Sequence, residues 1–61
     1  MLLSFIDVFS SNVFINPEYV VAVFTAQDGE HEGKTVISLI NGNAIVNEDL
    51  ATTVGVINGA K

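Results

Sequence analysis

The chain lacks cysteine, tryptophan and arginine, and it carries little positive charge. Without cysteine it can form neither disulfide bonds nor thiolate metal sites. Its only cationic side chains at neutral pH are Lys34 and Lys61, set against seven acidic residues, and the formal net charge is −5. Nucleic acid polymers and anionic membrane surfaces are both bound through clusters of Lys and Arg. We therefore expect neither a nucleic acid nor a membrane as partner.

Long apolar runs are also missing. The Leu2-Leu3 start is apolar, but no basic segment precedes it and Asp7 interrupts it. This pattern is typical neither of a signal peptide nor of a membrane-spanning helix. The sequence accordingly predicts a cytoplasmic protein.

What the chain has in quantity is apolar surface. It has 61 residues, of which 49% are hydrophobic, and we expect one small domain over residues 1–61. A domain of this size buries only about 60% of the surface that its unfolded chain exposes. Since disulfides are excluded, the apolar excess predicts a homo-oligomer.

The chain is organised around residues 35–46, where two β-rich runs flank Asn41-Gly42. This dipeptide is typical of a type I′ hairpin, because both central positions need φ > 0. The turn predicts that Ile40 pairs with Asn43 and Leu39 with Ala44. Alternation then gives one wholly apolar core face, formed by Ile37, Leu39, Ala44 and Val46. The opposite face is mixed and needs a cover; it holds Val36, Ser38, Ile40, Asn43, Ile45 and Asn47.

The flanking segments favour more strands. Residues 2–9 and 13–15 read as a hairpin, and Asn16-Pro17-Glu18 has the composition of a capped helical turn. The strand predicted over 19–25 is apolar on both faces, which is typical of a central strand or of an interface. Residues 26–34 form a polar, acidic connector.

The C-terminal tail predicts a short helix with Asn47 as its cap and with Leu50, Val54 and Ile57 on one face. Asn58-Gly59 would end this helix in the left-handed conformation. A fifth strand is the alternative, because residues 52–56 are poor helix formers. The predicted fold is mainly β (α+β): a small antiparallel sheet of four to five strands with a short C-terminal helix on one face.

Two segments are similar to a known family. Residues 13–18 (Val-Phe-Ile-Asn-Pro-Glu) and 35–42 (Thr-Val-Ile-Ser-Leu-Ile-Asn-Gly), followed by a capped amphipathic tail, resemble the small FlbD-type proteins of bacterial flagellar operons. Those proteins run through an F-x-I-N strand and a T-V-I-x-L-x-N-G strand. The resemblance implies the same kind of fold, a flagellar role and no catalytic residues. This chain differs in its first strand, its longer acidic connector and its few lysines.

No motif predicts catalysis or a bound metal or cofactor. Glu30-His31-Glu32 has ligand chemistry, but neighbouring residues point apart and a glycine-bounded loop does not preorganise ligands. Asp7 is interpreted as an edge residue whose charge blocks uncontrolled sheet pairing. Glu48 and Asp49 are interpreted as ordinary acids of a first helical turn.

The leading functional hypothesis is a non-enzymatic, self-assembling module that binds a protein or a small anionic ligand. Its oligomer interface is predicted at Val20, Ala22, Phe24, Val36, Ile40 and Ile45. The alternative is a viral sponge in the host cytoplasm, which sequesters a cyclic nucleotide signal between protomers. The ligand-binding residues predicted for such pockets are Lys34, Asn41, Asn43 and Asn47.

Overall fold

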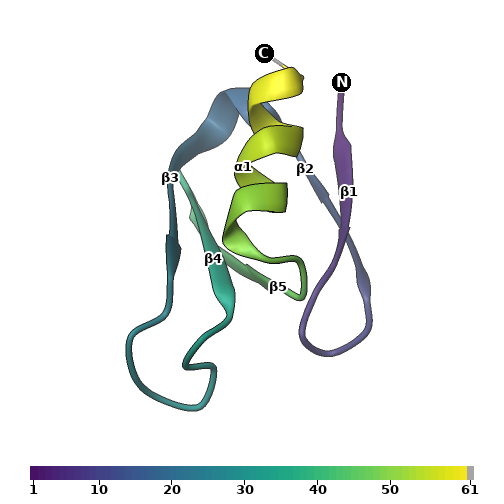
Figure 1. Ribbon diagram of the computed structural model, residues 1–61. Helices are drawn as coiled ribbons and strands as arrows, with labels where there is room; N and C mark the ends of the chain where they lie inside the picture. Colours follow the sequence, from purple (N-terminus) through teal and green to yellow (C-terminus); the bar gives the residue numbers. More distant parts are fainter. Residues whose placement is uncertain (61) are drawn as a thin grey trace.

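The computed structural model describes residues 1–60, which fold into five strands, one 3-10 turn and one helix (Figure 1). The strands form two antiparallel sheets, of two and three strands. The first sheet pairs β1 (Leu3–Ile6) with β2 (Asn12–Ile15), and η1 (Pro17–Tyr19) leads from it into the second. The second has the order β3 (Val20–Thr25), β4 (Thr35–Leu39) and β5 (Gly42–Val46). The chain continues into α1 (Leu50–Gly59).

A mainly β fold with a C-terminal helix is thus confirmed, whereas the prediction of one sheet is wrong. The two sheets meet at a single bridge between Asp7 and Val46. On either side of it, the N–H of Val8 donates to the carbonyl of Ile45 (3.1 Å) and the N–H of Asn47 to that of Ile6 (3.0 Å). β1 ends just before this bridge, because the chain turns back at Asp7.

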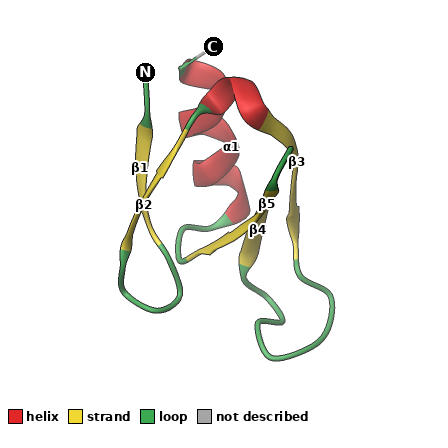
Figure 2. Cartoon of the chain, turned by 180° about the vertical axis from the view of Figure 1, so that it is seen from behind, coloured by secondary structure: helices red, strands yellow, loops and turns green. Residues whose placement is uncertain are grey.

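The core lies where both sheets face the helix. Figures 1 and 2 show α1 between the β1–β2 hairpin and β3. The buried cluster draws on both sheets and on the helix: Phe5, Ile15, Ile37, Val46 and Ile57. Burial of each such side chain contributes about 1.5–3 kcal/mol, so this cluster is the main source of stability.

The β4–β5 hairpin has the predicted faces but not the predicted register. Leu39 pairs with Gly42 and Ile37 with Ala44, so the turn residues are Ile40 and Asn41. The turn is not type I′, since Gly42 has φ +152° while Asn41 has no positive φ. Moving the turn by one residue shifts each pairing partner by two residues, so the same side chains still share a face. Hydrophobic alternation therefore predicts the core face without distinguishing the two registers.

The helix is confirmed, with different caps. Asp49 is the N-cap residue, and its carboxylate accepts a hydrogen bond from the N–H of Thr52 (3.3 Å). The helix ends at Gly59, and its C-cap residue Ala60 has a right-handed conformation, so the predicted left-handed end at Asn58-Gly59 is wrong. Its buried face is formed by Thr53 and Ile57. Leu50, expected on that face, is 38% exposed.

The β1–β2 turn depends on Asp7. Its Oδ1 accepts hydrogen bonds from the N–H groups of Phe9 (2.9 Å) and Ser11 (2.8 Å), and Ser10 takes a φ of +67°. Asp7 therefore organises a turn instead of guarding an edge. The Asn16 cap of η1 is confirmed, because its side chain accepts from the N–H of Glu18 at 3.0 Å.

Candidate functional site

The surface of this chain is rich in large apolar side chains. Within residues 1–60, six hydrophobic residues are buried, while eleven large ones are exposed. The exposed set is Met1, Leu2, Ile6, Phe9, Phe14, Tyr19, Val21, Phe24, Ile40, Leu50 and Val56. Single exposed hydrophobics are ordinary, but grouped ones mark interaction surfaces.

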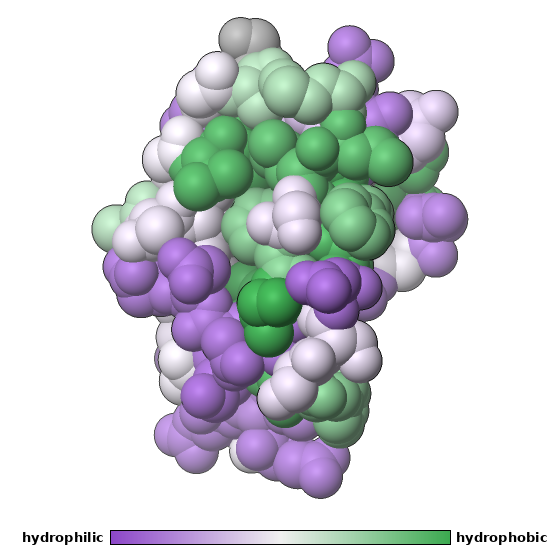
Figure 3. Space-filling view, turned by 90° about the vertical axis from the view of Figure 1, so that its right-hand side faces the viewer, coloured by the Kyte–Doolittle hydropathy of each residue, from purple (hydrophilic) through white to green (hydrophobic). Residues whose placement is uncertain are grey.

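One group lies on the outward face of the β1–β2 hairpin. Phe14 pairs with Ser4, and Leu3, Phe5, Val13 and Ile15 turn the other way, toward the core. Leu2, Ile6 and Phe14 share the outward face and form what we call the hairpin patch. Phe14 is 63% exposed. Figure 3 views the molecule from this side and shows hydrophobic residues gathered in its upper half, with hydrophilic residues mostly below them. Sequence reasoning missed this patch, although the alternation of residues 2–6 carries its signal.

The other feature is the free edge of β3. β3 was predicted to be central or at an interface, and it is an edge strand: β4 lies on one side and, within residues 1–60, no strand pairs with the other. Its sequence, Val-Val-Ala-Val-Phe-Thr, contains no charge. A groove of about 260 Å³ runs between this edge and α1. It is lined by Val20, Val21, Ala22, Val23, Val54, Ile57 and Asn58.

A β-bulge lies between Val20 and Ala22. Because of it, the side chains of β3 are distributed between the two faces of the sheet differently from the prediction. Val20 packs against the core cluster, so its placement on the outer face is wrong. Beyond the bulge, Ala22 pairs with Ser38 and Phe24 with Val36, on the outer face as predicted. An extra residue reverses the alternation at one point, which sequence periodicity does not reveal.

The other predicted interface residues do not all lie on the outer face of the sheet either. Val36 lies between Phe24 and Ile45, its partners on the neighbouring strands, and is only 7% exposed. Ile40 is 68% exposed but lies in the turn, so its assignment to the strand face is wrong. On the outer face of this sheet, the only row of apolar side chains that runs across all three strands is therefore Phe24, Val36 and Ile45.

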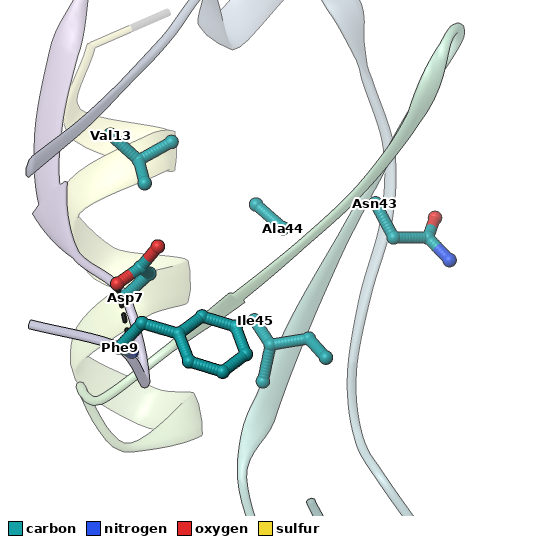
Figure 4. A pocket seen from close by; sticks show the side chains of 6 residues that line it. All are labelled: Asp7, Phe9, Val13, Asn43, Ala44 and Ile45. Carbon is teal, nitrogen blue, oxygen red and sulfur yellow. Dashed lines mark hydrogen bonds between the residues drawn. The ribbon is translucent and has the colours of Figure 1, made fainter. Parts of the chain in front are cut away.

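A hollow of about 240 Å³ lies between the β1–β2 turn and β5 (Figure 4). Its lining residues are Asp7, Phe9, Val13, Asn43, Ala44 and Ile45. Figure 4 shows the ring of Phe9 beside the aliphatic side chain of Ile45, whereas the side chain of Asn43 points away. Oδ1 of Asp7 already accepts hydrogen bonds from two backbone N–H groups. The hollow therefore combines an apolar wall with the carboxylate of Asp7, and no cationic side chain lines it.

The acidic connector folds back toward this hollow. The ring of His31 meets that of Phe9 edge to face, with centroids 5.9 Å apart. Its Nε2 lies 3.8 Å from Oε1 of Glu30. Within residues 1–60 no three His, Asp or Glu side chains are placed to share a metal ion.

The predicted ligand-binding residues fall at two ends of one hairpin. Lys34 and Asn47 flank the paired residues Thr35 and Val46, whereas Asn41 and Asn43 lie at or next to the turn. Asn47 is engaged, since its side chain donates to the carbonyl of Asp7 (3.0 Å). The other cation, Lys61, lies outside the described residues.

The helix N-terminus is unsuited to an anion. The carboxylate of Asp49 occupies it, and the hydrogen bonds from the Thr52 side chain and backbone lower the pKa of Asp49. A negative charge already lies where the backbone N–H groups point. Asn47, predicted as the cap, is displaced from this position.

No protein-family model, curated protein or solved structure matches this chain. Within residues 1–60, no helix is both long and apolar enough to cross a membrane.

Proposed function

We propose that this protein is a non-enzymatic module that works as a homo-oligomer and acts by binding. The observation that supports the proposal best is the number of exposed large apolar side chains, which exceeds the number that are buried. Exposed apolar surface is stabilised when a partner removes it from water, at about 25 cal/mol per Å². A small domain with a thin core gains stability in the same step.

The charge distribution is compatible with self-association. Net charge of −5 opposes the contact of identical chains unless the acids lie away from the interface. The acidic residues of the connector are Asp28, Glu30 and Glu32, while β3 and the hairpin patch contain none. Apolar contact is therefore available without bringing those carboxylates together.

Sequestration of a cyclic nucleotide is the less supported alternative. A pocket for it needs cations and free N–H groups, and Lys34 would have to meet its counterparts from other copies. The engaged side chain of Asn47 and the carboxylate of Asp49 both reduce what this end of the molecule offers an anion. A flagellar role, implied by the resemblance to FlbD-type proteins, stays a prediction.

The test is the native molar mass, measured by light scattering behind a sizing column across a dilution series. A multiple of 6.5 kDa that dissociates on dilution supports the proposal. A monomer at every concentration overturns it and directs attention to a different protein as partner. A thermal-shift panel of cyclic nucleotides tests the alternative, which predicts a raised melting temperature with at least one of them.

A further inference from the structure

The free edge of β3 has a defined pattern of outward backbone groups. The N–H of Ala26 donates to the carbonyl of Lys34 (2.9 Å), directly after the paired residues Thr25 and Thr35. In an antiparallel pair, residues alternate between bonding toward the neighbouring strand and pointing away from it. Phe24 therefore bonds toward β4, like Ala26, while Val23 and Thr25 direct their N–H and C=O groups away from the sheet.

A contact of Gln27 agrees with this pattern. Its side-chain Nε2 donates to the carbonyl of Thr25 at 3.1 Å. This carbonyl is therefore accessible from the edge and accepts a hydrogen bond from outside the β3–β4 ladder. A strand arriving at the edge would replace Gln27 there with a backbone N–H.

We infer that a second copy of this chain pairs with β3 along this edge, antiparallel and about a two-fold axis through Phe24. The inference rests on the proposed self-assembly and specifies where it occurs. Val23 of each copy lies opposite Thr25 of the other, so both outward residues exchange backbone hydrogen bonds. Phe24 then faces Phe24 of the second copy on the outer face, as a non-hydrogen-bonded pair whose side chains lie close together.

The chemistry of the edge favours a second copy over a charged peptide. Val23 and the α1 residues Val54 and Ile57 line the groove, and no charged side chain does. β3 carries none of the Lys or Pro residues that usually protect an edge, and its bulge lies outside the segment that pairs. An apolar strand of this kind is complementary to itself.

Charge also selects the direction of pairing. In a parallel arrangement the two connectors, with Asp28, Glu30 and Glu32, would lie side by side and repel. The antiparallel arrangement places them at opposite ends of the strand pair. The paired segment is short, so the contact area is small and we expect a dimer that dissociates at about micromolar concentration.

The first experiment compares the molar mass of wild type with that of two matched variants. Phe24→Lys places like charges opposite each other across the axis, whereas Phe14→Lys puts the same change on the hairpin patch. We expect Phe24→Lys to be monomeric where wild type is dimeric, and Phe14→Lys to remain dimeric. If Phe24→Lys is dimeric, or if only Phe14→Lys loses the dimer, pairing along the β3 edge is wrong, whereas the proposal of self-association still holds. A monomeric wild type overturns both.

A second experiment does not depend on a charge being tolerated. Since the chain has no cysteine, Phe24→Cys carries the only thiol. Non-hydrogen-bonded partners have Cα atoms about 4.5 Å apart, within the range of a disulfide. Mild oxidation should cross-link Phe24→Cys at least ten times faster than Phe14→Cys. Equal rates overturn the inference even if the molar mass shows a dimer.

Discussion

The side-chain amide of Asn47 donates a hydrogen bond to the backbone carbonyl of Asp7, 3.0 Å away and forty residues earlier in the chain. With the N–H of Asn47, which donates to Ile6, it fastens the first hairpin to the end of β5. This is the junction of the two sheets, so one residue after β5 holds together elements that local sequence does not connect.

Asn47→Asp should destabilise the protein about as much as Asn47→Ala, by about 1 kcal/mol each. A carboxylate cannot donate to a carbonyl, although it is an excellent helix cap. Urea unfolding of the variants measures the difference. Asn43→Asp, on the exposed end of β5, is the matched control and should change stability little. If Asn47→Asp retained wild-type stability, the donor role assigned to Asn47 would be wrong.

Asp49 should make stability depend on pH in the acid range. Its lowered pKa means that the ionised carboxylate stabilises the folded state. This contribution is fully present above the unfolded-state pKa, about 4, and is lost as pH falls through the lower folded-state pKa. Wild type should exceed Asp49→Ala in melting temperature at pH 7, and the gap should narrow from pH 4 toward pH 2. A gap independent of pH would contradict this role.

Thr53 is fully buried, and its hydroxyl donates to the carbonyl of Asp49 at 2.9 Å. The N–H of Thr53 also donates to that carbonyl, so removal of the hydroxyl leaves the acceptor satisfied. Thr53→Val should therefore lie within about 0.5 kcal/mol of wild type, whereas Thr53→Ala should cost about 1–2 kcal/mol through lost packing. Chemical denaturation of both variants is the measurement; a costly Thr53→Val would refute the argument.

Two glycines should respond oppositely to alanine. An added Cβ meets no neighbouring atom at either Gly42 or Gly55, so backbone conformation decides the sign. Gly42 has φ +152° and Gly42→Ala should cost about 1 kcal/mol or more. Gly55 lies within α1, where Gly55→Ala should stabilise by about 0.5–1 kcal/mol. Thermal unfolding distinguishes the two, and a stabilised Gly42→Ala would contradict the turn geometry.

Gln27→Ala should strengthen self-association several-fold. The Gln27 amide occupies the carbonyl of Thr25, which the second copy requires, and alanine removes this competitor. Sedimentation of wild type and variant at matched concentrations gives the dissociation constants. A weaker dimer would show that Gln27 helps the interface instead of covering it.

Local chemistry alone determined much of this protein. Alternation within residues 35–46 selected Ile37 and Val46 for the core, and both are fully buried. Asn16 before Pro17 specified a helical turn, since cap and φ preference act within three residues. The helix itself was predicted correctly, but its apolar spacing placed Leu50 on the buried face, where the structure instead buries Thr53 beside Ile57.

Tertiary contacts decided the rest, because they pair residues that local pattern leaves equivalent. Two hairpin registers bury the same face, and only the packed structure places Ile37 opposite Ala44. Asn47 and Asp49 are both residue types that cap helices well. Asn47 does not cap α1 because its side chain donates instead to the carbonyl of Asp7, which the first hairpin places beside it. The bulge beside Val20 and the free edge of β3 depend likewise on which strands become neighbours, and strand order is set by long-range packing.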